Sequence, residues 1–224
     1  MQAHTVVVGF GVKGRSTVAV LLDTGIRPSH IIVVDRTHEN VNAANALGCA
    51  AILGDGTREG TLRDAKVPEA GRVVVAVDRD DTAVLVTLTA RRLAPHATIV
   101  ASARENQNIE VLRQSGADTV IATSESAGRM LALSLTSPHA GNLVADLLEP
   151  QDGLEIIERA ARTDELGRDP LTLADDSDIV LAVVRGGQLH RFDHDRVRHL
   201  EPDDRLIVVR PVATSPSSSG RADR

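Results

Sequence analysis

The residues best suited to chemistry lie in a glycine-rich segment near the start of the chain. An apolar run at 5–8 leads into Gly9-Phe10-Gly11-Val12-Lys13-Gly14, and a second apolar run at 31–34 ends on Asp35. A G-x-G-x-x-G motif that follows a strand and opens a helix, with an acidic residue about 20 positions later, is typical of a dinucleotide-binding βαβ unit. Gly9 would allow the tight turn, Gly11 the approach of a pyrophosphate and Gly14 close helix packing, while Asp35 would hold ribose hydroxyls. The alternative is a glycine-rich turn that binds no ligand.

Alternating apolar and helical patterns predict the scaffold that positions this motif. The expected strands are at 5–9, 30–35, 49–53, 72–77, 97–101 and 117–121, and the expected helices between them at 14–24, 38–47, 57–65, 80–93 and 105–115. Six strands joined by helical crossovers predict an α/β fold with a Rossmann-like, doubly wound parallel sheet. A further helix is expected at 124–135, broken at Ser137-Pro138, with another short helix at 142–148.

The pattern changes after residue 153, where strands are separated by short turns. We expect strands at 154–161, 179–185 and 205–209, and Gly186-Gly187 fits a two-residue hairpin. The predicted organisation is a Rossmann domain at 1–137, a crossover and linker at 138–153, a smaller α+β domain at 154–211 and a disordered tail at 212–224.

Composition excludes several classes of protein. The net charge of −6 and the absence of a basic patch with aromatic residues argue against a nucleic-acid binder. No apolar run approaches the length of a membrane span, and no signal peptide is visible, so a cytoplasmic location without membrane insertion is expected. The single cysteine, Cys49, excludes an internal disulfide and fits a small buried side chain better than a reactive thiol. With 42% hydrophobic residues but only 1% aromatic ones, the core must be aliphatic.

Two sets of motifs, in order along the chain, resemble the RCK family, the regulators of potassium conductance and nucleotide-binding subunits of potassium-uptake systems. The resemblance covers about residues 4–211 and rests on the segments at 8–15, 34–35, 54–57, 77–81, 101–104, 116–121, 183–187 and 200–209. It implies a cytosolic gating domain or subunit that binds NAD(H) or an adenine nucleotide such as ATP, ADP or AMP. It also implies a membrane potassium pore as partner, in the same or a separate chain, and homodimers joined through the helix after strand six, often assembled into an octameric ring.

Several side chains near the expected strand ends are candidates for ligand contact. Asp55, two residues before Thr57, fits a contact to adenine or ribose, or a helix N-cap. Asp78, beside Val77 and Arg79, fits a ligand contact or a simple cap equally well. Arg104 is expected to bind phosphate, as in the family, and Arg15 either adds a phosphate contact or is solvated. Arg36 could accept a 2′-phosphate, but the charge of Asp35 would repel that group and favour NAD(H) or an adenine nucleotide without it.

Metal binding and catalysis have weaker support in the sequence. Where some channel members of the RCK family place calcium-binding carboxylates, this chain has Ser102-Ala103-Arg104, so a calcium switch at that place is doubtful and a role for any divalent cation is left open. The acidic groups Asp78, Asp80, Asp81 and Asp175, Asp176, Asp178 are interpreted as solvated faces or caps, and His190, His194 and His199 as a polar strand and loop.

No pair of residues at a recognisable spacing supplies an acid and a base, so we expect no enzyme. An NAD-dependent oxidoreductase is the alternative from another class, because fold alone does not determine function. A stand-alone subunit of a potassium-uptake transporter, rather than a channel tail, is the third interpretation.

Overall fold

The computed structural model describes residues 4–148, 153–173 and 178–212. The chain divides into two compact units, with the division between Met130 and Leu131. The expected linker at 149–152, the acidic residues Asp175 and Asp176, and the expected tail from 213 onward lie outside the described residues. The domain boundary expected at residue 137 therefore stays a prediction.

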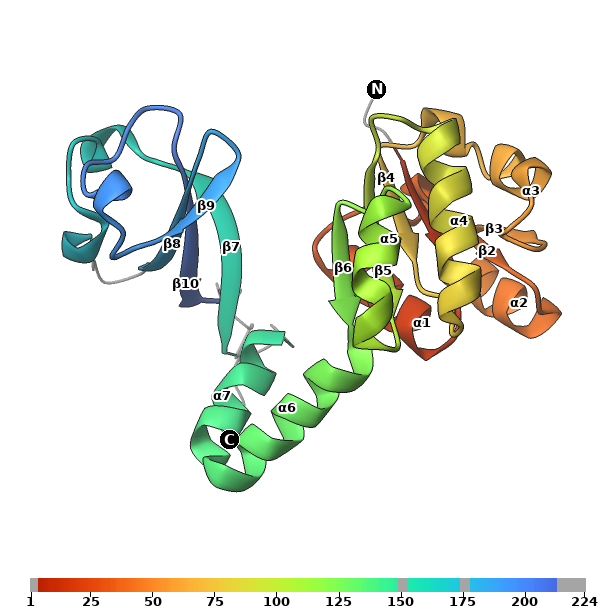
Figure 1. Cartoon of the computed structure of the whole chain (residues 1–224), viewed down its shortest axis with the longest axis horizontal. Helices are drawn as coiled ribbons and strands as arrows, with labels where there is room; N and C mark the ends of the chain where they lie inside the picture. The colour runs from red at the N-terminus through yellow and green to blue at the C-terminus, as the bar shows by residue number, and fades with distance from the viewer. Residues whose placement is uncertain (1–3, 149–152, 174–177, 213–224) are drawn as a thin grey trace, which may run out of the picture. The chain divides into compact units, whose positions relative to one another are not determined.

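The first unit is built on a six-stranded parallel sheet, which confirms the predicted fold class (Figure 1). Its strand order is β3-β2-β1-β4-β5-β6, and in the register of the central strands Thr5 lies beside both Ile31 and Arg72. The strands are β1 (Thr5–Val8), β2 (Ile31–Asp35), β3 (Ala50–Leu53), β4 (Arg72–Val75), β5 (Thr98–Ala103) and β6 (Thr119–Ala122). The order reverses between β1 and β4, and open α/β sheets bind ligands at the carboxyl ends of the strands at such a point.

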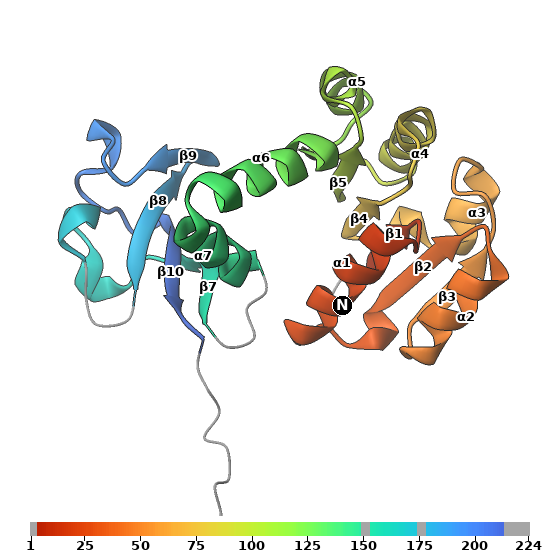
Figure 2. The same ribbon diagram turned by 90° about the horizontal axis from the view of Figure 1, so that it is seen from below.

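Helices cover both faces of this sheet (Figure 2). Helices α1 (Val12–Asp23) and α2 (His38–Ala46) lie on one face, and α3 (Glu59–Asp64), α4 (Asp80–Leu93) and α5 (Ile109–Gln114) lie on the other. The period-two alternation of strand side chains produces two separate cores. Val7 of β1 packs with Phe10 and Val18 on the first face, whereas Val6 and Val8 pack toward α3, α4 and α5 on the second.

Three helices of the first unit begin at other residues than expected: α1 begins two residues earlier, at Val12, and α3 and α5 begin later. Helix α3 begins at Glu59 rather than at 57, and a short 3-10 turn at Asn106–Asn108 occupies the expected first turn of α5. Before α3 the Asp55 carboxylate accepts from Thr57, a local turn that Asp side chains favour over helix, and before α5 the Asn108 N–H donates to the Glu105 carbonyl oxygen.

Helices α6 (Thr123–Thr136) and α7 (Pro138–Leu148) follow β6. The expected break at Ser137-Pro138 is present, but Pro138 opens α7 directly, so this helix is one turn longer than expected at its start; proline is favoured at the first helical position. Gly141 of α7 packs so closely on Ser134 that a Cβ atom would lie 2.5 Å from its hydroxyl oxygen.

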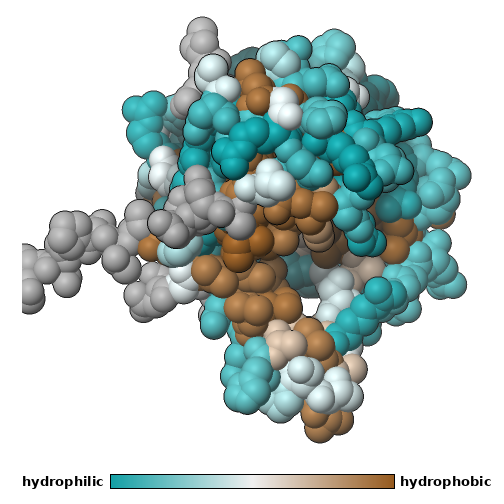
Figure 3. All heavy atoms as spheres, turned by 90° about the vertical axis from the view of Figure 1, so that its left-hand side faces the viewer, coloured by the Kyte–Doolittle hydropathy of each residue, from teal (hydrophilic) through white to brown (hydrophobic). Residues whose placement is uncertain are grey.

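The α6–α7 hairpin exposes apolar side chains. Leu131 and Leu135 are 73% and 83% exposed, and Leu143 and Leu148 of α7 are also exposed. Figure 3 shows apolar side chains gathered toward the lower part of that view, where the hairpin lies. Within the described ranges no helix is both long enough and apolar enough to cross a membrane.

The second unit contains a four-stranded antiparallel sheet in the order β7-β10-β8-β9. Its strands are β7 (Leu154–Ala160), β8 (Ile179–Arg185), β9 (Gln188–Arg191) and β10 (Arg205–Pro211). The predicted hairpin is confirmed, because Gly186 and Gly187 connect β8 to β9 with φ values of 58° and 76°, a conformation that favours glycine. An aliphatic core that includes Val183, Leu206 and Val208 lies on one face of the sheet.

Candidate functional site

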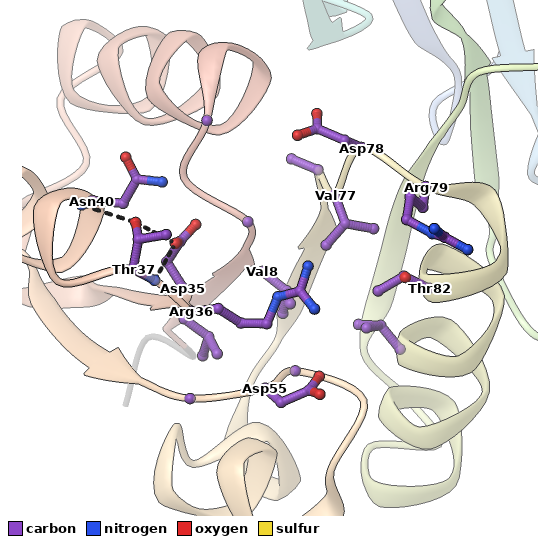
Figure 4. Close-up of a pocket in the computed structure, with 17 residues that line it drawn as sticks. Val8, Asp35, Arg36, Thr37, Asn40, Asp55, Val77, Asp78, Arg79 and Thr82 are labelled. Atoms are coloured by element: carbon purple, nitrogen blue, oxygen red, sulfur yellow. Dashed lines mark hydrogen bonds between the residues drawn. The ribbon is translucent and has the colours of Figure 1, made fainter.

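A cavity of about 330 Å³ opens at the carboxyl ends of β1, β2, β3 and β4 (Figure 4). This is the edge where the strand order reverses, as expected for a ligand site in such a sheet. The glycine-rich turn after β1 forms one wall. The polar side chains that line the cavity are those of Asp35, Arg36, Thr37, Asn40, Asp55, Asp78, Arg79 and Thr82.

The glycines of the turn are required by close contacts. Gly9 has φ 94°, and a Cβ atom there would lie 2.9 Å from the Ala76 carbonyl oxygen. At Gly14 a Cβ atom would lie 1.9 Å from the Gly9 carbonyl oxygen, so no other residue lets α1 begin so close to β1. Gly11 lines the cavity, and apart from Gly11 and its two chain neighbours no residue has an atom within 4 Å of its Cβ position. The space in front of Gly11 is therefore open to a ligand.

Asp35, at the end of β2, holds the turn and the loop after β2 together. Its Oδ2 accepts a 2.7 Å hydrogen bond from the Phe10 backbone N–H, and its Oδ1 accepts from both the N–H and the hydroxyl of Thr37. Burial alone would raise the pKa of Asp35, but these hydrogen bonds outweigh it and hold the pKa below its ordinary value. The carboxylate is ionised, and Oδ2 keeps a lone pair for a ligand hydroxyl.

Arg15 of α1 also connects the glycine-rich turn with the segment after β2. Its Nε donates to the Phe10 carbonyl oxygen, and its guanidinium donates to the Asn40 side-chain oxygen over 2.7 Å. Thr37 caps α2 by accepting from the Asn40 N–H, a role that threonine favours directly before a helix. Sequence reasoning did not select Thr37 and Asn40 as crevice residues; the capping pattern was the only signal for them.

Phe10 and Val12 do not present side chains to the cavity. The Phe10 ring is fully buried beneath the turn, and only its backbone faces Asp35. Val12 is 87% exposed in the first turn of α1. Of the two, only Val12 can contribute a backbone N–H at the start of α1 to a ligand, because the Phe10 N–H already donates to Asp35.

Asp55 and Arg36 face the cavity from β3 and β2 (Figure 4). Asp55 Oδ1 accepts hydrogen bonds from the backbone N–H and hydroxyl of Thr57, and these bonds, with the charge of Arg36 nearby, lower the Asp55 pKa. Because α3 begins at Glu59 after Arg58, Asp55 caps the preceding turn and not the helix. In Figure 4 the Arg36 side chain reaches across the cavity.

The end of β4 contributes Val77, Asp78 and Arg79 to the other wall. Arg79 forms an ion pair with Asp81, to which its Nε donates a 3.0 Å hydrogen bond. The Asp78 side chain is 88% exposed and lies 3.9 Å from the Lys13 ammonium group. Asp78 is thus the more available of the two for a ligand.

Arg104 does not line this cavity. It lies at the mouth of a second cavity, of about 430 Å³, together with Lys13, Asp78, Thr123 and Ser124. Sequence reasoning did not select Lys13 as a site residue. Its ammonium group donates to the Val77 carbonyl oxygen over 2.7 Å and to the Ser102 hydroxyl over 3.1 Å.

The arrangement is suited to binding a polar ligand with hydroxyl and phosphate groups. In residues 4–148, 153–173 and 178–212, no group of three or more His, Cys, Asp or Glu side chains could hold a metal ion. His190 and His194 pack ring against ring with centroids 5.1 Å apart, and His199 Nδ1 contacts the Gly167 carbonyl oxygen. Cys49 is buried in the core beneath α2, and this burial raises the pKa of its thiol.

Two relatives with assigned names are potassium-transport proteins. The chain is 26% identical over 174 residues to Ktr system potassium uptake protein C of Bacillus subtilis, covering 77% of this chain and 75% of that protein. It is 28% identical over 117 residues to the glutathione-regulated potassium-efflux system protein KefC of Escherichia coli, covering 52% of this chain. The chain spans only 18% of KefC and 24% of an uncharacterized protein of Methanothermus fervidus.

Solved structures share the fold. The GsuK channel bound to NAD superposes with a TM-score of 0.54 at 22% identity, covering 93% of this chain and 36% of that one. The C-terminal domain of Kef from Shewanella denitrificans, in its AMP-bound form, superposes with a TM-score of 0.51 at 22% identity, covering 64% of this chain and 90% of that one.

The family comparison matches the part of the chain that forms the crevice. The model of the TrkA-N domain matches residues 5–123, from the first residue of β1 to the first residue of α6. This span contains the glycine-rich turn, Asp35, Asp55, Asp78 and Arg104, and it confirms the resemblance seen in the sequence. The chain therefore belongs to the TrkA-N domain family.

Proposed function

We propose that this chain is a nucleotide-sensing regulatory domain of a potassium channel or transporter. The observation that carries the proposal is the crevice itself, where an open Gly11 faces an ionised Asp35 that retains an acceptor site. The backbone N–H groups at the start of α1 suit a phosphate, and Asp35 suits a ribose diol. Asp55 and Arg36 at the far wall suit the edge and the face of an adenine ring.

The preferred ligand is an adenine nucleotide without a 2′-phosphate, such as AMP, ADP, ATP or NAD(H). A phosphate on the 2′ oxygen would meet the negative charge of Asp35, and the Asp35 carboxylate already restrains the loop that would have to move away. The NAD and AMP in the two structures with this fold are compatible with the proposal.

The potassium system is inferred from the relatives. Ktr system potassium uptake protein C, of which the chain covers 75%, favours a separate regulatory subunit, whereas a channel tail agrees with the likeness to GsuK. In both cases the partner is a membrane potassium pore, and the domain acts on the cytoplasmic side. A ligand that binds one conformation better than another shifts the fraction of open pores without covalent chemistry.

We further propose that the regulatory unit is a homodimer, able to build a larger ring. No residue of α6 is buried, and in α7 only Gly141 is buried. An apolar hairpin left uncovered to this extent usually marks an interface. Light scattering with refractive-index detection tests this, because a chain without Trp or Tyr barely absorbs at 280 nm. Monomers at all concentrations would contradict it.

Calorimetric titration with AMP, ADP, ATP, NAD, NADH and NADP tests the ligand assignment. Asp35→Ala should weaken binding by about 1–3 kcal/mol, the size of hydrogen bonds to a charged group. Tightest binding by NADP would overturn the role of Asp35. Parallel assays of NADH oxidation with carbonyl substrates test the oxidoreductase alternative, and substrate-dependent oxidation would overturn the regulatory proposal.

A further inference from the structure

Lysine is rare in this chain, and one of its two lysines lies in the glycine-rich turn. Of the 25 cationic residues 23 are arginine, and the lysines are Lys13 and Lys66. Lysine differs from arginine in being a compact point charge with three rotatable donors, which suits contact with a single phosphate oxygen. Position 13 therefore carries a point charge in a chain that otherwise uses arginine, and the contacts of this ammonium group decide what it can bind.

The Lys13 ammonium group is held in place while one of its donors stays available. Two donors are used by the Val77 carbonyl oxygen at the end of β4 and by the Ser102 hydroxyl on β5. The Ser102 hydroxyl in turn donates to the Val75 carbonyl oxygen, so it can only accept from Lys13. The Asp78 carboxylate at 3.9 Å is beyond hydrogen-bond distance, and the Lys13 side chain is 27% exposed.

The cavity in front of Lys13 adjoins the nucleotide crevice. Asp78 lines both cavities, so the two cavities are neighbours at this residue. Arg104 supplies a second cation there, and its position is defined by Asp80, which accepts hydrogen bonds from the Arg104 and Glu105 backbone N–H groups. These bonds, together with the side-chain amide of Asn108, position the loop after β5.

We propose that this second cavity binds the second phosphate of the ligand, with Lys13 as its main contact and Arg104 as a second one. The inference rests on the proposed nucleotide site and narrows its ligand class to adenine nucleotides with at least two phosphates. The first phosphate lies at the start of α1, and the next one reaches the free donor of Lys13. The proposal requires the Asp78 carboxylate, which is 88% exposed and held by no hydrogen bond in the described part of the chain, to turn away from Lys13 when the phosphate binds.

The test compares AMP with ADP on the full chain and on two variants. The wild type should bind ADP at least about tenfold more tightly than AMP, and Lys13→Met should reduce that preference by about ten- to a hundredfold, the range for one hydrogen bond to a charged group. AMP affinity should stay within about threefold. Lys66→Met is the matched control, because Lys66 lines neither cavity and its replacement should change neither affinity.

Arg104→Met provides a second variant that leaves the strand ends intact, because the Arg104 side chain is 71% exposed. This variant should lower the affinity for ADP by about three- to tenfold and leave the affinity for AMP unchanged. It tests the second-phosphate site even if Lys13→Met fails to fold. Equal affinities of the wild type for AMP and ADP, or equal losses for both in the variants, would overturn the second-phosphate site. If AMP binds and Asp35→Ala weakens that binding as proposed above, the proposed function survives such a result; if neither nucleotide binds the wild type, both proposals fail.

Discussion

Arginines play opposite roles in the two units of this molecule. In the second unit Arg159 is 14% exposed and pairs with Glu165 at 2.6 Å and with Asp178 at 2.8 Å, and these two acids are themselves 6% and 3% exposed. In the crevice of the first unit Arg36 makes no hydrogen bond or ion pair within the described residues, and only its charge acts on Asp55. A cation whose donors are all used supports the fold, whereas one with unused donors in a cavity is available to a ligand.

The carboxylates show the same contrast. Burial would raise the pKa of Glu165, but Arg159 and the Arg162 backbone N–H outweigh it and lower the pKa. In the second unit this network connects β7 with the 3-10 turn at Thr163–Glu165. Asp35 is intermediate, since it restrains the glycine-rich turn and still has room for one more hydrogen bond. Buried ion pairs are therefore structural in the second unit, whereas charged groups with unused hydrogen-bonding capacity define the site in the first.

The largest effect is expected from Arg159→Met. It leaves the buried Glu165 and Asp178 without their main partner, and breaking such a pair costs about 3–5 kcal/mol of unfolding free energy. Urea unfolding followed by far-ultraviolet circular dichroism measures this loss. Arg205→Met, which breaks a half-exposed pair with Glu158 in the same sheet, is the control and should cost about 1 kcal/mol or less. Equal losses of unfolding free energy in the two variants would contradict the distinction between buried and half-exposed ion pairs.

The pH dependence of unfolding gives a second, smaller effect. Asp204, buried beside Arg185, and Glu165 both have lowered pKa values, so their stabilisation is complete above their unfolded values of 3.8 and 4.5. That stabilisation is lost as the pH falls through the folded-state pKa values. Below about pH 4.5, Glu165→Gln should reduce the slope of stability against pH by up to one proton, or about 1.4 kcal/mol per pH unit. An unchanged slope would show that Glu165 does not titrate with unfolding.

Arg36→Met should separate binding from folding. We expect nucleotide affinity to fall by about 1 kcal/mol, the size of a cation stacked on an aromatic ring, because the guanidinium faces the adenine in our proposal. The unfolding free energy should change by less than about 0.5 kcal/mol, as for other exposed substitutions. Calorimetry and urea unfolding measure the two quantities. A loss of stability without a loss of affinity would place Arg36 with the structural arginines.

The smallest effect is expected from Asp81→Asn. The hydrogen bond from Arg79 holds the pKa of Asp81 well below its usual range, yet both side chains are exposed to water, at 72% and 62%. Solvent screening leaves such a pair with little net stabilisation. The urea midpoint should not change measurably. A clear decrease would show that a strong pKa perturbation is sufficient to identify a structural pair in this protein.

Much of the architecture was predictable because it depends on local patterns. The strands and helices around the glycine motif and the Gly186-Gly187 hairpin each follow from short-range periodicity or turn chemistry. The missed details, such as the start of α3 at Glu59, depend on which of several local hydrogen bonds prevails. The buried network of Arg159 was not predictable, since it joins residues up to 19 positions apart whose acids look like an ordinary exposed run in the sequence.

By itself, the sequence determined the fold class, the place of the crevice and the choice of Asp35, because glycine spacing and an acidic residue after the second strand define a βαβ unit locally. Only the tertiary structure separated Arg104 from that crevice, buried the ring of Phe10 and brought Lys13 to the ends of β4 and β5. The physical reason is sequence separation: the Lys13 ammonium group, for example, donates to Val77 and Ser102, which are 64 and 89 residues away. Parallel strands that are distant in sequence present their carboxyl ends at one edge only after the sheet has formed.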